Sequence, residues 1–328
     1  MIQKISKLKL NHFLASLEKD YEIYAPVKKG EIFEFEKLTD DKIINFFESS
    51  YSSFKKLIFP AVDEICKTLN NTYSPPSIPF KKVVFGMTAS DIHALNSLKK
   101  IMLSPIEDAR FADHLKMTTF VTVTNGRIRS KKIITDEVEQ GYDLLMIKIG
   151  DNYYFESSNP KGEKIISSYK MENIDIEVET KPQSEFAIFQ DKEKIARAIE
   201  KSKGSHIWKD LAKICLGCGN CSDVCPLCYC FDTVDKFDAG NNAGTRCRIW
   251  DSCFYKKFDQ TTNHNFRENL EDRIYHFFHH KFVQALNERG DFNCNHCGRC
   301  IMACPVNINI FKVLDEILIK FGEENAKK

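Results

Sequence analysis

The sequence has no long uninterrupted hydrophobic run. Lys, Asp or Glu breaks every apolar stretch before it reaches the roughly 18 residues that a membrane-spanning helix requires. The first residues, MIQKISKLKL, also lack the apolar core and the small-residue cleavage site of a secretion signal. We therefore expect a cytoplasmic protein without a membrane span.

Charge of one sign is not in excess either. Lysine and arginine total 47, aspartate and glutamate total 46, and the formal net charge is +1. Basic and acidic residues are interleaved, which argues against nucleic acid or an anionic membrane surface as a partner. Glycine-rich phosphate loops of the G-x-G-x-x-G or Walker type are missing, so nucleotide binding has no sequence support. We expect a protein or small-molecule partner instead.

Cysteine is scarce in the first part of the chain and dense in the rest. Of the 13 cysteines, only Cys66 precedes Cys215. A chain of 328 residues is long enough for two domains. We expect the boundary between the two domains in the segment VETKPQSEFAIFQ. We predict an α+β protein, with a mixed α/β domain at residues 1–185 and a sulfur-rich domain at residues 186–328.

The predicted first domain alternates helices and strands. Apolar residues at helical spacing, Leu8 among them, predict a helix near residues 5–17. A β-branched run at residues 83–85 leads into a helix that Ser90 or Asp91 would cap. TTFVTVTNG is typical of a strand, and YDLLMIKIGDNYYFESS predicts two strands joined by a turn at residues 150–152. We expect Cys66 to be a core thiol on a helix.

The sulfur-rich half contains one cysteine pattern twice. Each copy reads C-x2-C-x2-C-x3-C-P, which is the run found in bacterial ferredoxins with two [4Fe–4S] clusters. Three cysteines at intervals of three can hold three corners of one cubane, and glycines such as Gly217, Gly219 and Gly298 would permit close backbone approach. The copies are Cys215, Cys218, Cys221, Cys225 with Pro226, and Cys294, Cys297, Cys300, Cys304 with Pro305.

In such ferredoxins the fourth cysteine of each run ligates the other cluster. We therefore assign to the first cluster Cys215, Cys218, Cys221 and Cys304, and to the second cluster Cys294, Cys297, Cys300 and Cys225. This exchange ties the two motifs together, and we expect a mainly helical domain of the dicluster-ferredoxin type. Zinc is the alternative, because two C-x2-C pairs can build a tetrahedral site. Zinc gives no reason for a third cysteine at the same interval, a fourth followed by proline, and a full repetition.

Four cysteines in this half lie outside the two runs. Four more thiolates could hold a third [4Fe–4S] cluster and lengthen an electron path. The alternative is that some of them are buried free thiols, because cysteine packs as a small hydrophobe. His264 competes with Cys247 for the role of fourth ligand. The four cysteines are Cys228, Cys230, Cys247 and Cys253.

The motifs CLGCGNCSDVCPLCYCFD, RIWDSC, NHNFR, HHKF and CNHCGRCIMACPVNINI occur in this order. In that order they resemble the iron–sulfur beta subunit of cytoplasmic nickel–iron hydrogenases with sulfur-reductase activity. The ferredoxin-like A subunit of anaerobic sulfite reductase is similar too. The resemblance implies an electron-transfer subunit of a redox complex, placed between a flavin-containing subunit and a metal-containing catalytic subunit.

Two departures from that resemblance bear on the site. Ser90-Asp91 stands where the family usually has a Cys-Asp pair, which removes any role for a thiol there. Cys247 stands where an arginine is more usual, so the ligands of a third cluster are expected to be Cys228, Cys230 and Cys253, with the fourth ligand open.

The remaining polar residues of this half are expected to support the clusters. The histidines of YHFFHHKF, His276, His279 and His280, have a spacing that can bind metal, but packing and hydrogen bonding near the clusters are the preferred reading. The same segment is expected to supply an aromatic surface for a partner. Basic residues could offset the negative charge of the clusters, or they could form a solvated face, and the candidates are Arg246, Arg248, Lys281 and Arg299.

Catalysis by the chain itself has little sequence support. No nucleophile or acid–base pair stands out beside the cysteines. The alternative is a stand-alone disulfide or sulfur reductase that acts at an open site on a third cluster.

Overall fold

The computed structural model covers the chain and describes residues 2–39, 44–70, 72–182, 189–238 and 240–322. These residues form two compact units. Unit 1 comprises Met1–Ser184 with Lys236–Arg246, and unit 2 comprises Glu185–Asp235 with Cys247–Lys328. The boundary predicted between residues 185 and 186 lies outside the described residues. The described helices are all too short or too polar to cross a lipid bilayer.

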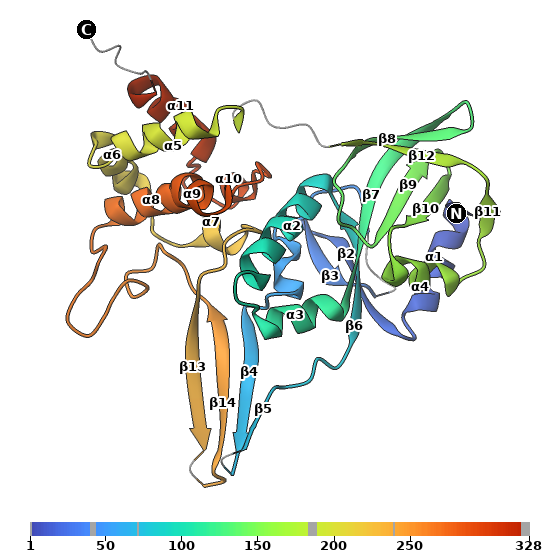
Figure 1. The fold of residues 1–328 in the computed structure, drawn as a ribbon. Helices are drawn as coiled ribbons and strands as arrows, with labels where there is room; N and C mark the ends of the chain where they lie inside the picture. The colour runs from blue at the N-terminus through green and yellow to red at the C-terminus, as the bar shows by residue number, and fades with distance from the viewer. Residues whose placement is uncertain (1, 40–43, 71, 183–188, 239, 323–328) are drawn as a thin grey trace. The chain divides into compact units, whose positions relative to one another are not determined.

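Unit 1 is mixed α/β, as predicted for this part of the chain (Figure 1). Its large sheet has the order β11-β1-β10-β9-β7-β6-β2-β3, with β8 and β12 joined to β7 through β8. The central pairs β2–β6, β6–β7 and β7–β9 are parallel, and so is the pair β8–β12, whereas the other pairs of this sheet are antiparallel. The strands are β1 (Ile2–Ser6), β2 (Tyr21–Lys29), β3 (Ile32–Lys37), β6 (Lys81–Met87), β7 (Thr118–Arg129), β8 (Lys132–Val138), β9 (Leu144–Ile149), β10 (Asn152–Ser157), β11 (Glu172–Ile174) and β12 (Glu177–Pro182).

The strands in the middle of this sheet are buried along consecutive residues, which include threonines of β7 as well as apolar side chains. Buried residues follow one another along the first part of β7 and along β9, as expected of parallel strands covered on both faces. Phe13, from the helix α1, packs edge-on against Phe85 of β6 and Phe155 of β10. The helices of unit 1 are α1 (Lys7–Leu17), α2 (Ala89–Leu103), α3 (Ala109–Lys116) and α4 (Pro160–Ser167), besides a 3-10 turn, η1 (Phe54–Leu57).

Three local predictions for unit 1 are wrong. Leu8 is 88% exposed, because α1 begins only at Lys7 and turns Leu10, Phe13 and Leu14 toward the core. Thr88 caps α2 rather than Ser90 or Asp91, and Asp91 closes a capping box as the third helical residue. Cys66 lies half-buried on a strand.

A second sheet has the order β13-β14-β4-β5. Its strands are β4 (Val62–Leu69), β5 (Thr72–Ser74), β13 (Phe231–Asp238) and β14 (Ala243–Trp250). Residues 236–246, at the end of the β13–β14 hairpin, belong to unit 1. A segment from the later half of the sequence thus completes a sheet whose other strands come from residues 62–74.

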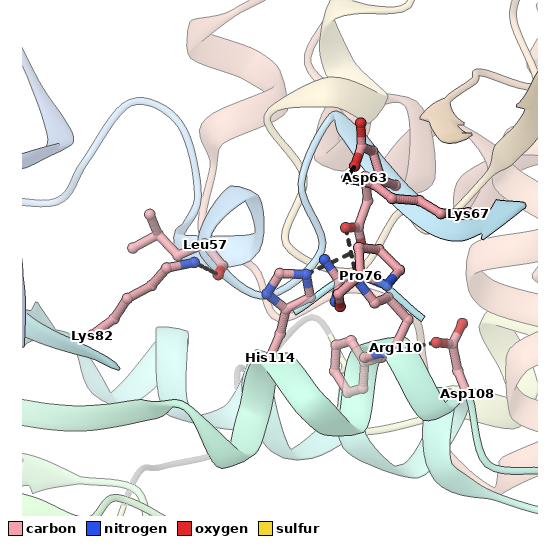
Figure 2. A network of polar contacts seen from close by, with 10 residues as sticks. Leu57, Asp63, Lys67, Pro76, Lys82, Asp108, Arg110 and His114 are labelled. Atoms are coloured by element: carbon pink, nitrogen blue, oxygen red, sulfur yellow. Dashed lines mark hydrogen bonds and ion pairs between the residues drawn. The ribbon is translucent and has the colours of Figure 1, made fainter. Parts of the chain in front are cut away.

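A buried ion-pair network joins β4 to α3 (Figure 2). Asp63 is 3% exposed and accepts from Arg110 Nε at 3.0 Å, while His114 Nε2 lies 3.1 Å from its other carboxylate oxygen. Arg110 also donates to the carbonyl of Pro76 at 2.8 Å. Burial alone would raise the pKa of Asp63, but the hydrogen bonds and charges of His114 and Arg110 outweigh it and lower the pKa.

We expect Asp63→Asn to lower the free energy of local opening of β4 and α3 by about 3 kcal/mol, because it leaves the mostly buried Arg110 cation without its counterion. Since the pKa of Asp63 is lowered in the fold, this contribution is present above about pH 4 and is lost as the pH falls through the lowered pKa. Native-state hydrogen exchange of amides in β4 and α3 measures it. The control is Asp113→Asn, which breaks an exposed pair with Lys116 and should cost less than about 1 kcal/mol. Equal losses in the two variants would contradict the expectation.

Unit 2 contains several helices around an aromatic core. Trp208 lies against Tyr275 and Phe278, and Phe282 contacts Phe278 and Phe292. A π-helical turn, η3, interrupts the long helix between α8 and α9. The elements are α5 (Lys192–Lys201), α6 (His206–Ile214), α7 (Asn220–Asp223), α8 (Leu270–His279), η3 (His280–Gln284), α9 (Ala285–Arg289), α10 (Arg299–Met302) and α11 (Ile310–Phe321).

Candidate metal centres

The two cysteine motifs fold into loops with the same backbone pattern. In the first loop Gly217 and Gly219 have φ of 63° and 79°, and in the second His296 and Gly298 have φ of 56° and 74°. Each loop then enters a short helix, α7 or α10, that carries the third cysteine. The repetition in sequence is therefore a repetition in structure.

The left-handed backbone explains most of the glycines. A Cβ on Gly298 would meet nothing within 4 Å, so its φ alone favours glycine there. A Cβ on Gly219 would lie 2.7 Å from the ring of Tyr255, so space adds to the requirement. His296 adopts the left-handed conformation without being glycine, and its ring stacks on Phe311 at 3.9 Å. Sequence reasoning missed His296, although alignment of the two motifs places it opposite Gly217.

A cavity in unit 2 is lined by cysteines from both motifs. Cys215, Cys218 and Cys221 of the first motif line it together with Cys304, the fourth cysteine of the second. Cys300 reaches the same cavity, and much of the remaining wall is apolar. The fold thus brings the last cysteine of the second motif to the first three cysteines of the first.

The fourth cysteine of the first motif lies among the cysteines of the second. Burial raises the pKa of Cys294 to about 12, with Cys225 and Cys297 adding to the rise and Lys281 opposing it. Burial also raises the pKa of Cys300, and Cys225 is the neighbouring thiol with the largest effect. Cys225 is itself buried. The two fourth cysteines therefore lie beside opposite motifs.

Backbone amides donate to the sulfur atoms of several of these cysteines. Gly217 N lies 3.4 Å from Cys215 Sγ, and Leu227 N lies 3.4 Å from Cys225 Sγ. Ile308 N lies 3.2 Å from Cys304 Sγ. Amides aimed at sulfur stabilise thiolates and the anionic cluster that thiolates hold, so this donor set suits iron–sulfur ligation.

The cysteine arrangement differs from that of a single-ion site. A structural zinc ion needs four ligands at about 2.0–2.3 Å from one point. In the described part of the chain, no three Cys, His, Asp or Glu side chains converge closely enough to hold one ion. The cysteines surround a cavity instead, as thiolates at the corners of a larger cluster would.

Lys281 is a buried cation between the cysteine groups. Its Nζ donates to Cys225 Sγ at 3.2 Å and to the carbonyl of Asn293 at 3.1 Å. Burial would lower its pKa, but the surrounding thiol groups, Cys225 foremost, raise the pKa well above the ordinary value. Sequence reasoning singled out Lys281 but missed Asn293, whose contribution comes from the backbone.

The cysteines outside the motifs are partly brought together. Cys253 is buried, and a hydrogen bond with Cys230 raises its pKa. Cys228 is half-buried beside the aromatic core. Cys247 is buried on β14, whereas His264 is exposed and its ring contacts Phe266.

The histidine segment packs rather than forming a surface. Phe277, Phe278 and Phe282 are core residues, so the prediction of an aromatic docking surface at YHFFHHKF is wrong. His276 and His280 stack at 5.9 Å, and burial lowers the pKa of both to about 4. The imidazoles are therefore neutral at physiological pH.

The predicted basic residues differ in burial. Arg299, in the second motif, is 2% exposed, and Arg248 is buried over the ring of Phe231. Arg246 is exposed, as expected of a solvated side chain.

The part of the chain that contains both cysteine motifs matches a known protein family. Residues 214–308 match the family described as a 4Fe-4S dicluster domain. The segment that contains both cysteine runs is thus of the type that carries [4Fe–4S] clusters, which confirms the predicted cofactor.

One relative is similar along almost the whole chain. It is the Sulfhydrogenase 2 subunit beta of Pyrococcus furiosus, 29% identical over 323 residues, which cover 93% of this chain and 95% of the relative. The predicted resemblance to the beta subunit of a hydrogenase with sulfur-reductase activity is therefore confirmed. No solved structure matches the chain.

Proposed function

We propose that this chain is the electron-transfer subunit of a multi-subunit redox complex. It relays electrons between a flavin-containing subunit and a metal-containing catalytic subunit of the hydrogenase, sulfur-reductase or sulfite-reductase type. The observation that carries the proposal is the cavity lined by Cys215, Cys218, Cys221 and Cys304, because it joins two ferredoxin motifs across the sequence. The similarity to a sulfhydrogenase beta subunit supports the choice of complex.

The proposed ligands follow from this arrangement. The first cluster takes Cys215, Cys218, Cys221 and Cys304, and the second cluster takes Cys294, Cys297, Cys300 and Cys225. Residues 186–328 would then be a mainly helical domain of the dicluster-ferredoxin type, and residues 1–185 a separate mixed α/β domain.

The residues around the proposed ligands would line the cluster site, hold the ligand sulfurs and contact a redox partner. Bound [4Fe–4S] clusters would supply one-electron transfer. Apolar side chains such as Phe254 and Phe277 line the cavity and keep water from it. Amides of Gly217 and Ile308 hold the ligand sulfurs. Cys218 is exposed beside Leu216, which is 65% exposed, and this apolar edge suits contact with a redox partner.

A third cluster is part of the proposal. Its ligands would be Cys228, Cys230 and Cys253, and the hydrogen bond between the last two supports the grouping. Of the two candidates for the fourth ligand, Cys247 is buried and His264 is exposed, which favours Cys247. A fourth position left open would instead favour a stand-alone disulfide or sulfur reductase.

An experiment on the isolated chain distinguishes an electron-transfer subunit from a stand-alone reductase. After anaerobic purification we expect it to accept about one electron per cluster from dithionite, because it holds carriers. It should release them to a one-electron dye, but should not turn over hydrogen, polysulfide or sulfite. Optical titration and product assays make the measurement. Sustained turnover of any of these substrates by the chain alone would replace the relay with the reductase.

A further inference from the structure

Lys281 occupies an unusual position for a lysine. The residue is 3% exposed, and a lysine is almost never buried unless it is paired with a partner. Its Nζ donates to the sulfur of Cys225 at 3.2 Å and to the carbonyl of Asn293 at 3.1 Å, and it lies 5.0 Å from the centre of the Phe277 ring. A sulfur, a carbonyl and an aromatic ring thus hold one positive charge in place.

The backbone fixes this position. Lys281 lies in the π-helical turn His280–Gln284, and such turns occur frequently at functional sites. The amide of Asn293 donates to the carbonyl of Lys281 at 2.9 Å, while the lysine ammonium donates to the carbonyl of Asn293. Asn293 directly precedes Cys294, so Lys281 links Cys225 to the start of the second motif.

We propose that Lys281 is a positioning residue that raises the reduction potential of the second cluster through its N–H···S bond to Cys225. The inference rests on the proposed ligand assignment. Reduction adds one electron, supplied by the electron donor, and therefore one negative charge to the cluster. A fixed cation hydrogen-bonded to a ligand sulfur stabilises that charge more than the oxidised state, and stabilisation of the reduced state raises the potential.

The effect should be selective for one cluster. The hydrogen bond of Lys281 goes to Cys225, which is assigned to the second cluster. The charge of Lys281 also acts on Cys221, which is assigned to the first cluster, but the sulfur that accepts its hydrogen bond is that of Cys225. Loss of the Lys281 charge should therefore move the two potentials by unequal amounts.

The test is a redox titration followed by electron paramagnetic resonance on the full chain, purified anaerobically. Lys281→Met should shift the potential of the cluster that Cys225→Ala perturbs to a lower value and shift the other cluster less. Lys281→Arg, which keeps the charge, should restore most of the potential. Lys213→Met removes an exposed lysine of α6 and should shift neither cluster. Unchanged potentials in a Lys281→Met protein with full iron content would overturn the proposal.

A second measurement uses the wild-type chain, so it does not depend on whether a variant binds its clusters. In wild-type chain labelled with [15N]lysine, pulsed electron paramagnetic resonance of the reduced second cluster should show a nitrogen coupling from the donated N–H. Absence of that coupling would also overturn the proposal. Wild-type protein without iron and labile sulfide would instead contradict the proposed function, so the two failures are distinguishable.

Discussion

Cys225→Ala is expected to damage the same cluster as Cys297→Ala, and a different cluster from Cys218→Ala. Cys225 lies only four positions after Cys221, yet it is the neighbouring thiol with the largest effect on Cys300 in the second motif. Sequence neighbours would then serve different clusters. Each substitution removes one of four thiolate ligands, so the affected cluster should lose most of its signal and up to about four iron atoms per chain.

Substitution of the fourth cysteine of the second motif tests the same exchange of ligands from the other side. Cys304→Ala should group with Cys218→Ala, because both residues line the same cavity. Electron paramagnetic resonance of the reduced variants, with iron and sulfide analysis, is the measurement. The control is Cys66→Ala, a half-buried cysteine on β4 in unit 1, which should leave iron content and spectra unchanged. If Cys225→Ala grouped with Cys218→Ala, the exchanged ligands would be wrong.

The parts of the site that could be predicted are those that depend on regular spacing. Three cysteines at intervals of three, with glycines between them, restrict the backbone to a tight left-handed loop, and the structure repeats that loop in both motifs. The doubled pattern was therefore enough to predict the cofactor.

Contacts between distant segments could not be predicted in the same way. Asn293 positions Lys281 through a carbonyl group that every residue possesses, so its side chain carries no signal. Asp63 and His114 meet only because β4 packs beside α3. The aromatic run near His280 was misread as a surface because hydrophobicity alone does not distinguish a core face from an interface.

Prediction from sequence was limited in a similar way for the first half of the chain. Alternating and continuous apolar runs were sufficient to predict strands such as β7, β9 and β10. Boundaries were less predictable, because Ile5 pairs in β1 before α1 begins and Thr88 competes with Ser90 as a cap. Cys66 lies on β4, which is placed between β14 and β5 in its sheet, and pairing with a strand so far along the sequence as β14 leaves no signal in the residues around Cys66.

The central claim is that electrons pass through this chain between other subunits. Its most direct test is electron flow in the anaerobically purified complex that contains Cys297→Ala in place of the wild-type chain. Transfer from the physiological donor to the catalytic subunit should fall at least about tenfold, because substitutions even around a metal ligand cost about 10–100-fold in metal affinity or activity. Activity with an artificial dye that reduces the catalytic subunit directly should remain, and Cys66→Ala should alter neither. If physiological and dye-driven activity fell together, or if physiological transfer persisted in Cys297→Ala, the chain would not be the relay.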